Sequence, residues 1–330
     1  MKVAVFSAKT YDREYLDKVN NSNTQQLTYF KAALNAGTTN LSIGFDAVCI
    51  FVNDTVDKAV IEKLAANGIK IIALRCAGFN NVDIAAAAAN NIKVVRVPAY
   101  SPQAVAEHAV ALILTLNRKT HKAYNRVRES NFSIEKLTGF NLYNKTVGVI
   151  GTGKIGIAFC TIMQGFGCKV IAYDLFESDY LKEKGIIYRS IDEILNQSDI
   201  ISLHCPLTPN TQYLFNSTAF SKMKDGAMLI NTSRGALINT ADAIDALKTG
   251  KLGYLGIDVY EQEENIFFKD LSESIVHDDL IERLISFHNV LITPHLGFFT
   301  KEALDQIAVT TLKNLMDFEN GLPLCNEIKM

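Results

Sequence analysis

The chain has 330 residues, of which 48% are hydrophobic and 21% charged, and its formal net charge is -2. This length and composition are typical of a globular protein with about two domains. The weak net charge, without a long run of like charges, argues against nucleic acid as a partner.

The longest apolar run, residues 109–116, is far shorter than the roughly 20 residues that a membrane span requires. The N-terminal run 3–6 is too short for a signal peptide. The cysteines show neither CxxC pairs nor the Cys/His spacing of a zinc site, so no metal is predicted and all are expected to be reduced, buried thiols. They are Cys49, Cys76, Cys160, Cys168, Cys205 and Cys325. A cytoplasmic protein is therefore expected.

Short apolar runs alternate with longer segments of helical periodicity along the chain. This alternation predicts parallel strands joined by crossover helices, and the richness of the runs in Val and Ile predicts a sheet covered on both faces. The predicted strands are residues 2–6, 47–52, 69–74, 94–97, 147–150, 170–173, 200–203, 228–230, 256–259 and 290–292.

One long segment interrupts this alternation. Ser101 and Pro102 form an N-cap followed by proline at the first helical position, and neither Gly nor Pro recurs before Gly139. A helix over residues 102–129 is therefore predicted, with the domain boundary at its start. Its apolar first half fits a buried spine and a subunit contact equally well. Further on, the capping box of residues 190–193 predicts a short helix.

The hexad Gly151-Thr152-Gly153-Lys154-Ile155-Gly156 follows an apolar strand and opens a helical segment. This context is typical of a dinucleotide-binding loop. Gly151 would permit the tight turn, Gly153 would let backbone amides approach the pyrophosphate, and Gly156 would allow close packing of helix on strand. A structural turn or a methyltransferase loop are the competing interpretations.

Asp174 follows the next predicted strand and lies 21 residues beyond Gly153. An acid about 20 residues beyond such a loop hydrogen-bonds the ribose hydroxyls of NAD. Its carboxylate would repel a 2′-phosphate, which favours NAD over NADP. The competing interpretation of Asp174 is a helix cap.

Ligands bind beyond the carboxyl ends of parallel strands, so the polar residues that follow the predicted strands are the candidates for chemistry. These are Asp174, residues 204–206, residues 231–234, Asp258 and residues 293–295. Hydride transfer from a reduced nicotinamide to a carbonyl needs a proton donor, a group that polarises the carbonyl and an anchor for any carboxylate. Histidine and arginine suit these roles.

Two of the six histidines, His204 and His295, remain as candidate proton donors. The others lie on the predicted long helix or in polar connecting stretches and are interpreted as solvated or capping residues; they are His108, His121, His277 and His288. His295 is favoured by its position in a loop between Pro294 and Gly297.

Arg234 and Glu263 each have two interpretations. Arg234 lies in a Ser-Arg-Gly turn and is either an anion-binding group or a plain surface arginine. Glu263 lies near Glu261 and Glu264, so a solvated acidic loop is a stronger interpretation of this residue than a catalytic role. Spacing alone does not choose between these carboxylates.

Several long motifs in the same order resemble the D-isomer-specific 2-hydroxyacid dehydrogenase family over nearly the whole chain. Within the family, the chain is most similar to the bacterial fermentative NAD-dependent D-lactate dehydrogenases. The motifs are the glycine hexad and residues 75–83, 97–100, 202–208, 231–235, 258–263 and 294–295.

The resemblance implies a catalytic set of Arg234, Glu263 and His295, and it is what selects Glu263 from its acidic neighbours. Protonated His295 would give a proton to the pyruvate oxygen while NADH delivers hydride, Glu263 would favour the charged imidazole, and Arg234 would hold the carboxylate. Many relatives have proline directly after this glutamate, whereas Glu264 and a long insertion follow here.

The resemblance also implies the remaining contacts and the fold. The substrate would contact Ala77, Gly78, Tyr100 and Phe299, and Phe299 would lie near the methyl group of pyruvate. The cofactor would meet the glycine loop with Lys154 and Ile155, and also Asp174, Pro206, Thr232 and Asp258. An α/β fold of two domains is expected, with a Rossmann NAD-binding domain (101–297) inserted into a flavodoxin-like substrate domain (1–100 and 298–330).

The resemblance further implies a helix returning over about 300–319, a cleft that closes over the cofactor, and at least a dimer. Two other functions remain open at this point. One is reduction of another 2-oxo acid, such as hydroxypyruvate, phenylpyruvate or a branched substrate. The other is an NADH-sensing transcriptional co-repressor, a class that shares the fold but carries partner-binding tails.

Overall fold

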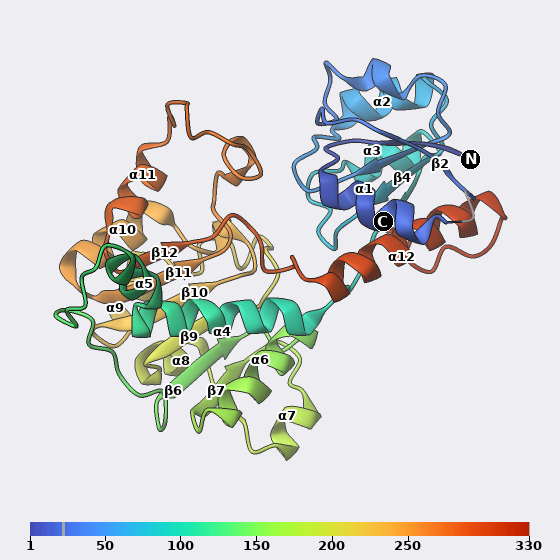
Figure 1. Cartoon of the computed structure of the whole chain (residues 1–330). Coiled ribbons are helices and arrows are strands. Elements are labelled where there is room, and N and C mark those ends of the chain that lie inside the picture. The colour runs from blue at the N-terminus through green and yellow to red at the C-terminus, as the bar shows by residue number, and fades with distance from the viewer. Residues whose placement is uncertain (22–23, 330) are drawn as a thin grey trace. The chain divides into compact units, whose positions relative to one another are not determined.

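The computed structural model describes residues 1–21 and 24–329. The chain forms two compact units, and each contains a parallel sheet and helices (Figure 1). Unit 1 consists of Met1–Ser101 and Phe298–Met330, and unit 2 of Pro102–Gly297.

Unit 1 has a five-stranded parallel sheet in the order β2-β1-β3-β4-β5. This is the flavodoxin-like order, with ligands expected at the carboxyl ends of the strands. The strands are β1 (Lys2–Val5), β2 (Gln26–Tyr29), β3 (Ala47–Ile50), β4 (Ile71–Leu74) and β5 (Lys93–Val95). The helices are α1 (Thr10–Val19), η1 (Thr39–Ser42), α2 (Lys58–Ala66), α3 (Ile84–Ala89) and α12 (Lys301–Glu319).

Unit 2 has a seven-stranded parallel sheet in the order β12-β11-β10-β9-β6-β7-β8. The order reverses between β6 and β9, and this is the doubly wound order of a Rossmann fold. The strands are β6 (Thr146–Ile150), β7 (Lys169–Tyr173), β8 (Ile187–Tyr188), β9 (Ile200–Leu203), β10 (Ala227–Asn231), β11 (Leu252–Ile257) and β12 (Val290–Ile292).

Helices cover both faces of the unit 2 sheet, because its strand side chains alternate between two apolar clusters. Met228 and Ile230 pack with helices α4 and α6, whereas Leu229 packs with α8, α9 and α10. The helices are α4 (Pro102–Arg118), α5 (Thr120–Arg128), α6 (Lys154–Gly165), α7 (Asp179–Glu183), α8 (Ile191–Gln197), α9 (Ser217–Lys222), η2 (Gly235–Leu237), α10 (Thr240–Thr249), η3 (Glu263–Asn265) and α11 (Asp279–Ser286).

Each of the ten predicted strands overlaps an observed strand, and the α/β fold class is confirmed. The strand predicted at 256–259 is shifted, because β11 spans Leu252–Ile257. Two strands were not predicted, β2 and β8, which form the outer edges of their sheets. Both are only partly buried: β2 alternates polar and apolar residues, and β8 spans only two residues. The capping box of Ser190 with Glu193 and the returning helix α12 are confirmed.

The prediction of one unbroken helix over residues 102–129 is wrong. Lys119 has a left-handed backbone with φ of 50° and separates α4 from α5. No glycine or proline signals this break. The two helices also differ in burial: α4 is buried along much of its length in the unit 2 core, and α5 has no buried residue. The apolar half of α4 is therefore a spine of unit 2.

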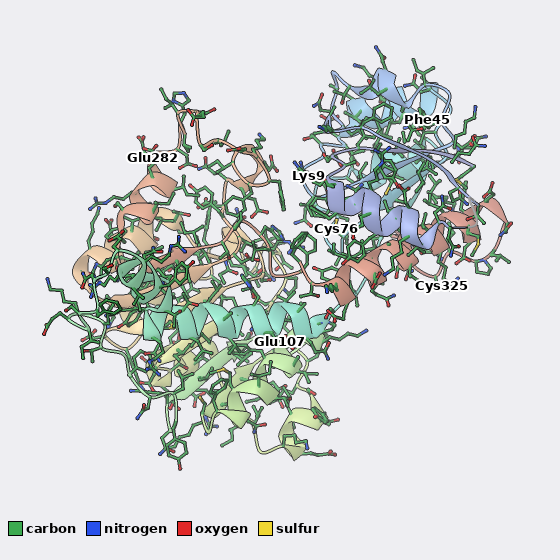
Figure 2. All side chains as sticks on the ribbon, viewed as in Figure 1. Lys9, Phe45, Cys76, Glu107, Glu282 and Cys325 are labelled. Carbon is green, nitrogen blue, oxygen red and sulfur yellow. The ribbon has the colours of Figure 1, made fainter. Side chains whose placement is uncertain are left out.

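The cysteines are all free, but the expectation that all are buried is wrong. Cys49, Cys76, Cys160 and Cys205 are buried and Cys168 is half-buried. Cys325 is exposed because it lies beyond α12 (Figure 2). Of the helices in residues 1–21 and 24–329, none is long and apolar enough to span a membrane.

Candidate active site

Glu263 and His295 form a hydrogen-bonded pair beyond the carboxyl ends of two adjacent strands, β11 and β12. The Nδ1 atom of His295 lies 3.0 Å from Oε1 of Glu263, and Oε2 of Glu263 accepts the backbone N–H of Tyr260 at 3.0 Å. Both carboxylate oxygens are therefore used, and the imidazole is held at Nδ1. The other ring nitrogen, Nε2, is the one that can transfer a proton to a substrate.

His295 has a left-handed backbone with φ of 55°, which is unusual for a bulky residue. Residues in such conformations cluster at functional sites, where the surrounding structure holds them. The ring of Phe268, also at positive φ, lies 5.8 Å from the imidazole between centroids. The insertion after Glu263 thus supplies a side chain that packs on His295.

Arg234 follows β10, the strand next to β11 in the sheet. The turn that carries it is fixed by Asn231, which is fully buried, accepts the N–H of Ser233 and donates to the carbonyl of Arg234. Within the described residues, no carboxylate pairs with Arg234; one guanidinium nitrogen donates to the carbonyl of Ser233. The guanidinium retains donors for an anion.

His204 is excluded as the proton donor. Its ring packs on Phe159 at 4.9 Å between centroids, and Nε2 lies 2.9 Å from the hydroxyl of Ser202. Burial lowers the pKa of His204 to about 3, so the imidazole is neutral at physiological pH. Its backbone lies against the glycine loop, since a Cβ at Gly151 would lie 2.5 Å from the carbonyl carbon of His204.

The glycine loop joins β6 to α6 and needs glycine at two positions for steric reasons. Gly151 has φ of 96°, and a Cβ there would lie 2.5 Å from the backbone of Cys205. A Cβ at Gly156 would lie 2.0 Å from the carbonyl oxygen of Gly151. At Gly153, by contrast, a Cβ would meet no described atom within 4 Å, and no side chain caps the amides of α6. The loop thus presents uncapped helix amides to open space, which suits a pyrophosphate.

Asp174 follows β7 and points toward the same loop. Its Oδ2 accepts both the N–H and the hydroxyl of Thr152, and Oδ1 accepts the N–H of Phe176. The nearest helix, α7, has Ser178 as its N-cap, so the competing interpretation of Asp174 as a helix cap is wrong.

The other predicted cofactor residues lie at the carboxyl edge of the same sheet. Lys154 and Ile155 open α6, and Pro206 follows β9 as an exposed residue. Thr232 follows β10, and its buried hydroxyl has no hydrogen-bond partner among the described residues. A buried hydroxyl without a partner is costly unless a ligand satisfies it.

The predicted substrate residues Ala77, Gly78 and Tyr100 belong to unit 1. Ala77 and Gly78 follow β4, and the carbonyl of Ala77 accepts a hydrogen bond from Arg96 at 2.8 Å. Within residues 1–21 and 24–329, the amides of Ala77 and Gly78 donate to no protein acceptor. Two adjacent amides of this kind can bind a carboxylate.

An aromatic cluster in unit 1 surrounds the predicted Phe299. Phe299 is 47% exposed and packs edge-on against Tyr11, with centroids 4.8 Å apart. The neighbouring Phe298 is buried and contacts both Tyr100 and Phe51. The sequence motif did not single out Phe298 and Phe51, because only the fold brings residues 51, 100 and 298 together.

The interpretation of His108 as a solvated or capping residue is wrong. Its Nε2 lies 3.0 Å from the hydroxyl of Thr293 and 3.2 Å from Oδ1 of the buried Asp258. No local sequence pattern signals this contact, because it depends on which face of α4 packs against β11 and β12.

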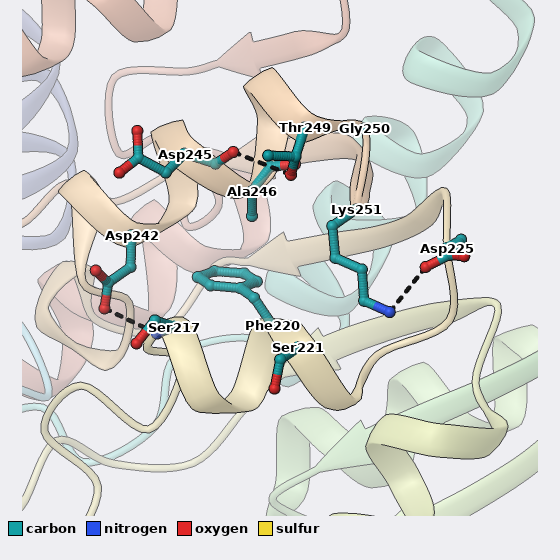
Figure 3. Close-up of a pocket in the computed structure, with 10 residues that line it drawn as sticks. All are labelled: Ser217, Phe220, Ser221, Asp225, Asp242, Asp245, Ala246, Thr249, Gly250 and Lys251. Atoms are coloured by element: carbon teal, nitrogen blue, oxygen red, sulfur yellow. Dashed lines mark hydrogen bonds and ion pairs between the residues drawn. The ribbon is translucent and has the colours of Figure 1, made fainter.

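A separate pocket of about 700 Å³ lies between α9 and α10 in unit 2 (Figure 3). It includes Asp225 and Lys251, which form an ion pair just before β10 and β11 begin. The pocket is therefore at the amino end of these strands, whereas Arg234 and Glu263 follow their carboxyl ends. In the described part of the chain, no group of three or more His, Cys, Asp or Glu residues could hold a metal ion.

Comparison with known proteins gives the family. Residues 110–297 match the family model of the D-isomer specific 2-hydroxyacid dehydrogenase, NAD binding domain. The chain is 52% identical to the D-lactate dehydrogenase of Escherichia coli over 328 residues, which are 99% of this chain and 100% of that protein. The chain belongs to the D-isomer-specific 2-hydroxyacid dehydrogenase family.

Solved structures of this family match the chain over nearly its whole length. The apo structure of D-lactate dehydrogenase from Escherichia coli matches with a TM-score of 0.92 at 50% identity and covers 100% of both chains. The D-lactate dehydrogenase from Aquifex aeolicus, in complex with NAD and lactic acid, matches with a TM-score of 0.86 at 34% identity, covering 97% of this chain and 96% of that one.

Unit 2 therefore carries the NAD-binding domain of a 2-hydroxyacid dehydrogenase. The residues present fit this cofactor on structural grounds. The glycine loop leaves helix amides uncapped, Asp174 provides an acceptor beside the loop, and Thr232 has a buried hydroxyl that needs a partner.

Proposed function

We propose that the protein is an NAD-dependent D-lactate dehydrogenase that reversibly reduces pyruvate to D-lactate. The observation that carries this proposal is the Glu263–His295 pair, with Nδ1 and Oε1 3.0 Å apart at the carboxyl edge of the NAD-binding sheet. Similarity to D-lactate dehydrogenase over 99% of the chain supports the choice of substrate.

NADH supplies the hydride that reduces the C2 carbonyl carbon of pyruvate. The chain supplies the proton: protonated His295 gives its Nε2 proton to the carbonyl oxygen, so that the C=O bond becomes CH–OH. Glu263 accepts a hydrogen bond from Nδ1–H throughout and stabilises the imidazolium before transfer. One hydride and one proton are added to pyruvate, and lactate and NAD are the products.

Arg234 binds the carboxylate of pyruvate and polarises its carbonyl. A planar guanidinium can bind a carboxylate through two hydrogen bonds, which fixes orientation as well as charge. The amides of Ala77 and Gly78 and the hydroxyl of Tyr100 bind the same carboxylate, and Phe299 packs near the methyl group. The support for these roles is the unused donors of Arg234 and of the two amides.

In this proposal, the residues that bind the cofactor are Asp174, the glycine loop with Lys154 and Ile155, Pro206, Thr232 and Asp258. Asp174 accepts from ribose hydroxyls and disfavours the additional phosphate of NADPH, since both would be negatively charged. The position of its carboxylate beside Thr152 of the loop supports this role.

The protein assembles at least as a dimer through unit 2 in this proposal. Several large apolar side chains, each more than half exposed, lie on α5 and the segment that follows it: Tyr124, Val127, Phe132, Ile134 and Tyr143. A contiguous exposed apolar patch is typical of an interaction surface, and the exposed apolar side chains of this segment support one here. A cytoplasmic location completes the proposal, and the predominance of buried, free cysteines supports it.

Steady-state kinetics with NADH and a panel of 2-oxo acids test the proposal. We expect the highest kcat/KM for pyruvate, with lower values for hydroxypyruvate, phenylpyruvate and branched 2-oxo acids. A clear preference for one of the bulkier acids would assign the protein to another 2-hydroxyacid dehydrogenase activity. A lack of NADH oxidation with every acid would overturn the enzymatic proposal.

A further inference from the structure

A buried polar network in unit 2 contacts the turn that carries His295. It joins His108 on α4 to Asp258, which follows β11, and to Thr293, which follows β12. His108 comes directly after Glu107, which Figure 2 labels on α4. The side chain of His108 is 15% exposed and that of Asp258 is 2% exposed, so water cannot replace these contacts freely.

Asp258 fixes both ends of the His295 turn. Its Oδ1 accepts the hydroxyl of Thr293 and the N–H of Leu296 at 2.9 Å, and its Oδ2 accepts the N–H of Gly297 at 2.7 Å. Between these anchors, the N–H of His295 donates to the carbonyl of Thr293 at 3.0 Å. Asp258 therefore anchors the turn on both sides of His295.

Gly297 leaves room for this arrangement. A Cβ at this position would lie 3.0 Å from Oδ2 of Asp258 and 3.5 Å from Cδ2 of His108. The backbone of the turn thus packs directly on the carboxylate and the imidazole, and a shift of either would be transmitted to the turn.

His108 favours the ionised form of the Asp258 carboxyl group, which is the form that can accept all the hydrogen bonds of the turn. An ionised carboxylate only accepts hydrogen bonds, and Asp258 faces three donors from the turn. Burial by itself raises the pKa of Asp258, but the hydrogen bond and charge of His108, together with Thr293 and His295, bring its pKa below the ordinary value. Since Asp258 accepts, Nε2 of His108 must carry a hydrogen and donate.

We propose that His108 is a positioning residue for catalysis, which acts through Asp258 to hold the turn of His295 in its productive conformation. The inference rests on the proposed role of His295 as the proton donor. It goes beyond that role because His108 lies on a different element, α4, and contacts neither Glu263 nor His295 in any described hydrogen bond.

The test compares His108→Leu with His108→Gln in the full-length protein. Leucine removes the donor, whereas glutamine can still donate from its amide. We expect kcat for pyruvate reduction to fall about ten-fold or more in His108→Leu, from the loss of a hydrogen bond to a charged group. Because Asp258 is also a proposed cofactor contact, the loss of NADH affinity, measured by fluorescence titration, should be smaller than the loss of kcat, and His108→Gln should recover most of both. His288→Leu is the matched control, because His288 is a histidine of the same unit outside this network.

A double-mutant cycle with Asp258→Asn shows whether His108 acts through Asp258. If it does, His108→Leu should have little further effect on kcat in the Asp258→Asn background. Additive losses would overturn the inference, as would an unchanged kcat in His108→Leu. A parallel loss of kcat and NADH affinity in both His108 variants would indicate a packing role and would also overturn it. Lack of activity in the unmodified protein would instead refute the proposed function.

Discussion

Replacing Glu263 by glutamine probes the pair on which the proposed chemistry depends. The carboxylate accepts two hydrogen bonds, from Nδ1–H of His295 and from the N–H of Tyr260, each with a donor–acceptor distance of 3.0 Å. Glutamine has one acceptor oxygen and one NH2 donor group. Its NH2 group must therefore face either the Tyr260 N–H or the Nδ1–H of protonated His295, and the charged imidazole loses its carboxylate partner in both cases.

The size of the effect follows from the hydrogen bond that is lost. A hydrogen bond to a charged group contributes about 1.5–3 kcal/mol, and each ~1.4 kcal/mol of transition-state stabilisation changes the rate about ten-fold. We therefore expect kcat/KM for pyruvate reduction to fall about 10- to 100-fold in Glu263→Gln. NADH affinity should change little, since Glu263 is not among the proposed cofactor contacts.

The assay is the loss of NADH absorbance with pyruvate, combined with a fluorescence titration of NADH. Glu264→Gln is the matched control, because it makes the same substitution at the exposed adjacent position. Wild-type kcat/KM in Glu263→Gln, or an equal loss in Glu264→Gln, would refute the assignment of the catalytic carboxylate.

Three further predictions follow from the site and the core. Arg234→Lys should lose most of its activity, about 100-fold in kcat/KM, because lysine keeps the charge but not the planar pair of donors; a variant with wild-type kinetics would exclude bidentate binding. Asp174→Asn should lower the preference for NADH over NADPH about ten-fold, measured as the ratio of kcat/KM values, and an unchanged ratio would contradict its ribose-binding role. Burial raises the pKa of Cys160 to about 12, so it remains a thiol at pH 8; iodoacetamide should label the exposed Cys325 first in the folded protein, and mass spectrometry showing early labelling of Cys160 would contradict the core.

Much of the fold is predictable because the central strands are continuous apolar runs. Strands β6, β9 and β10 are buried on both faces, so their sequences carry the signal directly. The polar residues after such strands must meet at one edge of a parallel sheet, and for this reason the sequence alone is enough to select Asp174 and Arg234 as candidates.

Other features depend on contacts that the sequence does not encode locally. The edge strands β2 and β8 pair with β1 and β7, and both are short and only partly buried. Lys119 breaks the long helix without glycine or proline, and the break separates the buried α4 from α5, which has no buried residue.

The candidate site likewise contains residues that the sequence selects and residues that it does not. Spacing does not separate Glu263 from Glu261 and Glu264, and the family resemblance is needed to choose it. The structure gives each neighbour a different environment: Glu261 accepts from Tyr213 and Thr240, whereas Glu264 is exposed. The hydrogen bond to His295 belongs to Glu263.

Chiral analysis of the product tests the central claim most directly. The purified protein is incubated with pyruvate and NADH, and the lactate formed is resolved into its enantiomers alongside a His295→Ala reaction. We predict that NADH is oxidised in step with pyruvate consumption, that the lactate is the D-isomer, and that the variant forms very little of it. L-lactate, no lactate at all, or undiminished turnover in His295→Ala would contradict the account.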